Sequence, residues 1–125
     1  MIALKVIPVM KCNDMPEALS FYTKILGFEL LDAWPPEAPV YCALSNADVV
    51  LNLSTNSGDG IAGNVVFIAV RGVDDLFKTF IARGLDTSKK KESPVHQGPL
   101  DQTWGWREFY VTDPSGNTLR FGEKL

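Results

Sequence analysis

The sequence has few of the residues that would cross-link a small protein or anchor it in a membrane. Only two of its 125 residues are cysteine, Cys12 and Cys42, and they form no Cys-x-x-Cys pair. We expect both to be reduced core residues of a cytoplasmic protein, because disulfide frameworks and zinc sites need more thiols at closer spacing. No apolar run approaches the roughly 20 residues of a membrane-spanning helix, so we expect no membrane partner.

Basic residues are too few for a nucleic-acid partner. Twelve Lys and Arg stand against 15 Asp and Glu, a net charge of −3, whereas binding to phosphates needs a basic face. The one basic cluster, Lys89–Lys91, is followed by Glu92 and is expected at a loop edge. Histidine is scarcer still, and the single His96 is expected in a surface loop rather than in a metal site.

The remaining composition is that of a folded domain, with 46% hydrophobic and 22% charged residues. Its clearest pattern lies near the end, where apolar residues alternate with polar or smaller ones over 107–111 and again over 118–122. This is the period of half-buried strands. Between them, Asp113–Asn117 combines the Asp, Pro, Gly and Asn of a tight turn. The chain is therefore predicted to end in a β-hairpin.

The whole chain shows one order of elements twice. The first half predicts a strand over 6–10, a helix from about Asp14 to Gly27, and strands over 28–31, 40–44 and 49–53, with a loop over 32–39. The second half predicts a strand over 65–70, a helix over 73–83, a strand near 87–95 and the hairpin. Residues 1–57 and 61–125 are thus expected to be two βαβββ modules of one α+β domain. Together they would form a curved mixed sheet with a concave face.

Several of these segments resemble a known superfamily. They are Ile7-Pro8-Val9-Met10, Leu26-Gly27-Phe28, and a tail in which Trp104-Gly105 precedes the Asp-Pro-Ser-Gly-Asn turn. The chain resembles the vicinal oxygen chelate superfamily, which includes glyoxalase I, extradiol dioxygenases and the bleomycin resistance proteins. The likeness covers the whole chain and is greatest to the bleomycin resistance proteins.

The resemblance also bears on catalysis. Enzymes of that superfamily hold a divalent metal through His, Gln or Glu side chains on the strands of the concave face. The matching positions here are Ile7, Val65 and Arg120. Two aliphatic side chains and a cation are not metal ligands. We therefore expect no metal, no cofactor and no catalytic residues.

Resemblance to the bleomycin resistance proteins implies a binding function. Those proteins are homodimers that sequester the drug, and so confer antibiotic resistance, in two grooves at the subunit interface. The ligand implied is a planar, cationic glycopeptide of the bleomycin type, free or metal-chelated. Pro8 would mark where the first strand is exchanged between subunits, and Glu37 and Asp59 would add negative potential. The residues expected to bind the ligand are Trp104, Gly105, Phe67, Trp34, Tyr41, Ser54 and Asp32.

Alternatives remain open from the residues alone. Phe67 fits a core position as well as a site, and Trp34 and Tyr41 equally fit packing beneath a proline-rich loop. Trp104 lies outside any strand period and is not needed by a core. Two other functions stay open: a glyoxalase-like lyase, isomerase or dioxygenase with a relocated metal, or a small-molecule sensor or carrier of the same fold.

Overall fold

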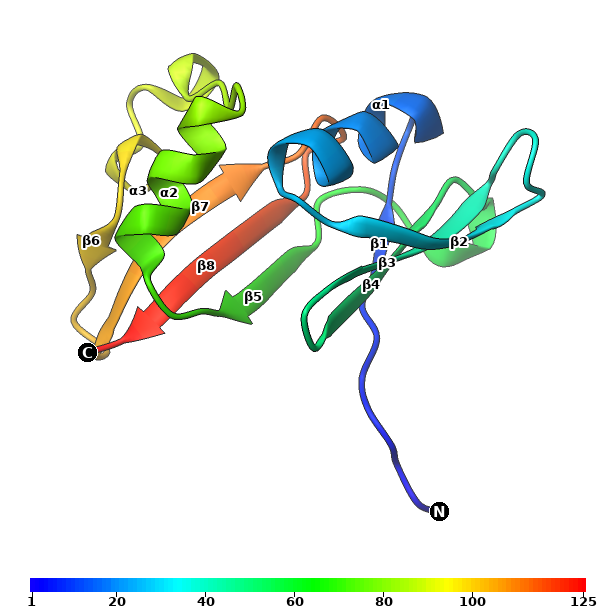
Figure 1. Ribbon diagram of the computed structural model, residues 1–125, viewed down its shortest axis with the longest axis horizontal. Helices are drawn as coiled ribbons and strands as arrows, with labels where there is room; N and C mark the ends of the chain where they lie inside the picture. Colours follow the sequence, from blue (N-terminus) through cyan, green and yellow to red (C-terminus); the bar gives the residue numbers. More distant parts are fainter.

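The structure, a computed structural model, describes residues 1–125 and consists of two modules, each with a helix over a four-stranded sheet (Figure 1). The first module contains β1 (Val9–Lys11), α1 (Met15–Ser20) continued by a π-helical turn (Phe21–Ile25), β2 (Glu29–Trp34), β3 (Tyr41–Asn46) and β4 (Val49–Ser54). The second contains β5 (Val65–Ala69), α2 (Val73–Ala82), α3 (Pro94–Gln97), β6 (Leu100–Asp101), β7 (Trp106–Thr112) and β8 (Thr118–Lys124). The predicted βαβββ order is confirmed in both halves.

The expected mixed sheet is present as two sheets, one for each module. Their strand orders are β1-β4-β3-β2 and β5-β8-β7-β6. In each, the first strand pairs in parallel with the last, and the other neighbours are antiparallel. Both sheets carry their helices on the same side, so both have a face turned away from helices (Figure 1).

Local signals in the sequence fix where the helices begin and end. Asp14 caps α1, its side chain accepting a 2.9 Å hydrogen bond from the Glu17 N–H. Gly27, at φ +76°, ends the helical segment in a conformation that side chains disfavour. A Cβ there would also lie 2.5 Å from the Arg83 guanidinium, which donates to the Ile25 carbonyl from the other module.

The core lies between the helices and the inner faces of the sheets, and alternate strand residues enter it. Cys12 and Cys42 are free and buried within it, as the sequence predicted. Tyr22, from the π-helical turn, is fully buried, and the terminal hairpin supplies Phe109 and Phe121, whose rings stack 5.2 Å apart. The core therefore joins both modules.

Three predicted boundaries are wrong. The strand expected near 87–95 is absent; Pro94 instead begins α3, and Gln97 ties its end to the Thr87 and Lys90 carbonyls. Proline lacks a backbone N–H and suits a first helical turn better than a strand. The second strand of this module is instead β6. The loop expected over 32–39 begins later, because β2 pairs with β3 as far as Trp34.

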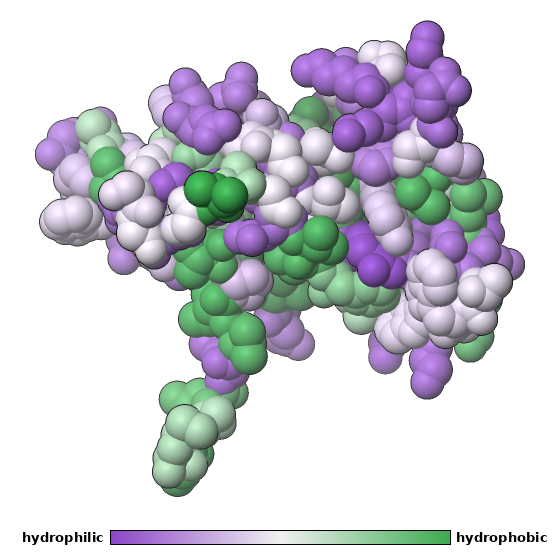
Figure 2. All heavy atoms as spheres, turned by 180° about the vertical axis from the view of Figure 1, so that it is seen from behind, coloured by the Kyte–Doolittle hydropathy of each residue, from purple (hydrophilic) through white to green (hydrophobic).

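The first strand begins at Val9, three residues later than predicted. Residues 1–7 form an extended arm that leaves the body of the protein (Figure 1). Its apolar side chains are almost fully exposed and stand out as a hydrophobic strip (Figure 2). They are Met1, Ile2, Leu4 and Val6. None of the helices has the length and hydropathy to cross a lipid bilayer.

Candidate functional site

The outer face of the first sheet gathers four of the predicted site residues. Cα register aligns Trp34, Tyr41 and Ser54 in one row across β2, β3 and β4, and Lys11 of β1 completes it. Asp32, in register with Ala43, lies in the next row on the same face. Since neighbours in register share a face, these side chains project together on the side away from α1. The alternation that buries the core residues of β3 and β4 thus places the predicted residues outside.

Some of the polar groups on this face form hydrogen bonds with one another. The Ser54 hydroxyl is buried; it donates to the Asp59 carboxylate and accepts from the Asn56 N–H. The Tyr41 hydroxyl accepts a 2.9 Å hydrogen bond from Asn52, whose carbonyl Oδ1 is buried without a partner. Asp59 is therefore a support for Ser54 rather than a free source of negative potential.

Trp34 is the exposed ring of this face, with 69% of its surface accessible. It ends β2, where the chain turns away from the sheet. The alternative left open from the sequence, that Trp34 packs beneath the proline-rich loop, is not what the structure shows. Asp32 is also exposed, and its carboxylate accepts only from the Ala33 N–H. Glu37 lies exposed in the loop that follows.

The outer face of the second sheet carries the remaining predicted residues. Phe67, Arg120 and Tyr110 align in one row across β5, β8 and β7. Phe67 is 41% exposed, and its ring stands edge-on to Trp106, with centroids 5.0 Å apart. The ring also lies against Gly122, where a Cβ would come within 2.6 Å of it. Phe67 is therefore a surface ring rather than a core residue.

Trp104 lies in the turn between β6 and β7, with 55% of its surface exposed. Gly105 follows it at φ +89°, a conformation that lets the turn close and that side chains disfavour. The indole N–H donates a 2.6 Å hydrogen bond to Glu108 Oε2. A buried carboxylate thus fixes how the exposed ring is oriented.

Glu108 is the residue of this face that sequence reasoning undervalued. It is fully buried, and its Oε1 accepts from Arg120 Nε at 2.8 Å and from Arg120 Nη2 at 2.7 Å. The Arg120 guanidinium carbon lies 5.0 to 5.7 Å from the ring centroids of Phe67, Trp104 and Tyr110. The predicted hairpin contained a signal for this contact. Glu108 and Tyr110 are two residues apart on one strand, so they lie on the same face of the hairpin as Arg120 on the other strand.

Comparisons with known proteins agree with this architecture. The sequence profile described as "Glyoxalase superfamily protein" matches residues 1–125. The chain belongs to the glyoxalase superfamily. A bleomycin resistance protein of Geobacillus stearothermophilus is 26% identical over an alignment 139 positions long, which covers 98% of each chain.

Two solved structures show the range within this superfamily. The bleomycin-binding protein of Streptomyces verticillus, complexed with copper(II)-bleomycin, superposes with a TM-score of 0.69 at 26% identity, covering 97% of this chain and 96% of its own. A glyoxalase-related enzyme from Clostridium phytofermentans superposes with a TM-score of 0.75 at 22% identity, covering all of this chain and 98% of its own. The second likeness shows the fold alone.

The residues at the superfamily's metal positions do not fit a divalent cation. Ile7 lies in the arm, and Val65 presents an aliphatic side chain on β5. Arg120 is a cation, and it pairs with the one buried carboxylate of that face, Glu108. No three His, Cys, Asp or Glu side chains gather closely enough to hold a metal ion.

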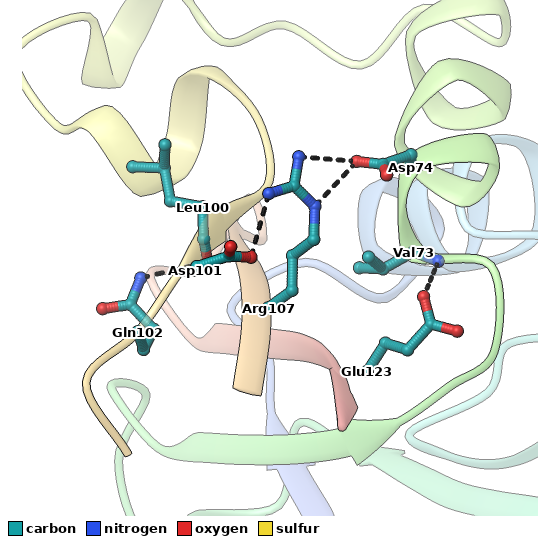
Figure 3. Close-up of polar contacts among 7 residues, drawn as sticks. All are labelled: Val73, Asp74, Leu100, Asp101, Gln102, Arg107 and Glu123. Carbon is teal, nitrogen blue, oxygen red and sulfur yellow. Dashed lines mark hydrogen bonds and ion pairs between the residues drawn. The ribbon is translucent and has the colours of Figure 1, made fainter. Parts of the chain in front are cut away.

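A second group of ion pairs, centred on Arg107 in the same sheet, has a structural role. Arg107, on β7, pairs at 3.0 Å with Asp74 of α2 and with Asp101 of β6 (Figure 3). Glu123 of β8 accepts the N–H groups of Gly72 and Val73 at the start of α2. These contacts tie the helix to its sheet. Arg107 and Glu108, adjacent in the chain, therefore form ion pairs with different partners.

His96 lies in α3, not in a loop, and is half-buried. Its ring nitrogens contact the hydroxyls of Ser93 at 2.8 Å and Thr112 at 3.0 Å. Burial, and then the charge of Lys90, lower the pKa of His96 below its ordinary value. The ring borders a cleft of about 420 Å³ on the helix side of the protein. The His96 ring also stands edge-on to Tyr110, with centroids 6.0 Å apart, and so adjoins the row of the second outer face.

Proposed function

We propose that this protein is a metal-free binding protein that sequesters bleomycin-type glycopeptides and so confers resistance. The observation that carries the proposal is the pair of outer faces. One presents Trp34 and Tyr41 and the other presents Phe67 and Trp104. Exposed rings of this kind suit flat heteroaromatic groups. Similarity along the whole chain to a bleomycin resistance protein supports the same ligand class.

We further propose that the protein acts as a homodimer in the cytoplasm, one domain per chain formed by modules 1–57 and 61–125. Within one chain, no hydrogen bond or aromatic contact joins the two groups of rings. A dimer would bring the first sheet of one chain opposite the second sheet of its partner. Two grooves would result, with Ser54 and Asp32 opposite Trp104 and Gly105. Free buried thiols are typical of a reducing compartment.

The arm over residues 1–7 supports the dimer. It exposes five large apolar side chains, a surface that soluble proteins rarely leave uncovered. The β1 and β5 strands are both sheet edges with unpaired backbone groups. Exchange of the arm between subunits, hinged at Pro8, would cover both features.

Calorimetric titration tests the binding function. We expect metal-free and copper-loaded bleomycin to bind with one site per chain, and Trp104→Ala to weaken binding at least tenfold. Ile81→Ala is the matched control, because Ile81 is an exposed apolar residue of α2 on the opposite side of the sheet. No heat at tens of micromolar, from protein that is a folded dimer, contradicts the proposal.

Two further measurements separate the other functions. Stoichiometric metal in protein purified without chelators would favour a glyoxalase-like lyase or dioxygenase with a relocated metal site. A thermal-shift response to unrelated small molecules, with none to bleomycin, would favour a sensor or carrier. Sedimentation of the full chain and of a chain lacking residues 1–7 tests the dimer. We expect deletion to raise the dimer dissociation constant at least tenfold.

A further inference from the structure

One buried carboxylate organises the second outer face. Glu108 accepts from Trp104 through Oε2 and from Arg120 through Oε1, so both carboxylate oxygens are used. Its side chain has no solvent exposure. A buried carboxylate needs such partners, because an unpaired charge in the interior is strongly destabilising. Glu108 is thus a positioning residue for the ring and for the guanidinium.

The three aromatic rings around Arg120 already bind a cation, which is the Arg120 guanidinium itself. Phe67, Trp104 and Tyr110 place their centroids 5.2, 5.7 and 5.0 Å from its guanidinium carbon. These distances lie within the range of favourable cation–π contact. A cationic group of a ligand would have to displace Arg120 or approach it against like charge. The negative charge of Glu108 is likewise balanced by Arg120. The corner of the sheet formed by Glu108, Arg120 and these three rings therefore has no free site for a cation.

What remains available at this corner is a donor and two ring surfaces. Glu108 occupies Nε and Nη2 of Arg120, while Nη1 makes no hydrogen bond or ion pair. The Arg120 side chain is 27% exposed, and the Phe67 and Trp104 rings are more so. An oxygen acceptor can therefore reach a guanidinium whose position is fixed beforehand. Such preorganised, charge-assisted hydrogen bonds are stronger and more selective than neutral ones.

We infer that this corner recognises a planar aromatic group bearing an anionic or carbonyl oxygen, which Arg120 binds through Nη1 while the ring stacks on Trp104 and Phe67. The inference rests on the proposed function in taking this face as the binding surface. It assigns the flat part of the ligand to the second sheet. Any cationic part of the same ligand is left to the other face, where Asp32 is exposed.

Matched naphthalene probes test the inference. We expect 2-naphthoate to bind the native dimer with a dissociation constant at least tenfold lower than that of 2-naphthylmethylammonium, as measured by calorimetry. Replacing the pair together, Arg120→Gln with Glu108→Gln, removes both charges without leaving either one buried alone. This double variant should lose the preference for the anion. Arg107→Gln, an arginine of the same sheet held by two other carboxylates, should keep it.

A single variant makes the opposite prediction. Arg120→Ala empties the ring cage and leaves the Glu108 carboxylate uncompensated, so the naphthyl ammonium probe should now bind better than 2-naphthoate. Equal binding of both probes to the native protein, or an unchanged preference in the double variant, overturns the inference. If the protein binds bleomycin but does not discriminate between the two probes, the inference is wrong and the proposed function stands. Preference for 2-naphthoate without bleomycin binding would instead overturn the proposed function.

Discussion

The Tyr22 hydroxyl donates a 2.7 Å hydrogen bond to Asp113 Oδ2, which joins the helix of the first module to the terminal turn of the second. Both residues are buried. Asp113 also accepts from the backbone N–H groups of Ser115 and Asn117 and from the Asn117 amide. Asn117 in turn donates to the Lys11 carbonyl on β1. The turn that the sequence predicted is thus also the polar joint between modules.

Tyr22→Phe should destabilise the protein by about 1–3 kcal/mol, because it removes one donor from a buried carboxylate. Urea unfolding measures the change. Tyr110→Phe is the matched control, since the Tyr110 hydroxyl makes no hydrogen bond, and it should cost less than about 0.5 kcal/mol. Equal losses in the two variants would show that the joint does not stabilise the fold.

Glu123→Gln should make stability less sensitive to acid. Hydrogen bonds from the Gly72 and Val73 N–H groups lower the pKa of Glu123 below its ordinary value of 4.5. The stabilisation this carboxylate provides is present above the pKa it has when unfolded and is lost as the pH falls through the lower, folded pKa. The native protein should therefore exceed the variant in Tm at pH 7, with the gap closing below pH 4.5. Glu92→Gln, which removes no hydrogen bond, should show no such gap.

Gly122→Ala should disturb the second outer face. The added Cβ would lie 2.6 Å from Phe67 Cζ and 3.1 Å from Glu108 Cγ, so the ring must move. Overpacking of this kind costs about 1–3 kcal/mol. Denaturant unfolding should show the loss, and Phe67→Leu in the same chain should restore part of it. A double-mutant cycle with no coupling between positions 67 and 122 would contradict this packing.

Cys12 should be unreactive in the native state. Burial first, and then the charge of Asp113, raise the pKa of its thiol to about 11, and burial also raises the pKa of Cys42. Since only the thiolate attacks disulfide reagents, labelling at pH 8 should proceed no faster than unfolding. Unfolded protein should react at once with two equivalents of the disulfide reagent, one for each cysteine. Rapid labelling of the native protein would show that the thiols are not buried.

Much of the fold was predictable because its signals are local. The cap at Asp14, the stop at Gly27 and the turn over Asp113–Asn117 each act within a few residues, and each is present. The strand expected near 87–95 failed for the converse reason. Its apolar content was weak, and the side-chain hydrogen bonds from Gln97 to the Thr87 and Lys90 carbonyls leave no periodic trace in the sequence.

The candidate site divides in the same way. Strand parity groups alternate residues within one strand, but only the observed register shows that Trp34, Tyr41 and Ser54 share a face. Parity alone could not tell whether that face is core or surface. Exposure of Phe67 depends on which side of its sheet α2 covers, and only packing of the whole module decides this.

The sequence by itself determined the βαβββ order and the turns, because residue type and spacing carry that information. Its resemblance to the superfamily added that Ile7, Val65 and Arg120 stand at the metal positions, and none of the three is a metal ligand. Only the tertiary structure decided that Glu108 neutralises Arg120 and orients Trp104. Those contacts span the β7–β8 hairpin and the turn before it, and their strength depends on burial. Burial is a property of the assembled sheet and helices, and no single segment contains it.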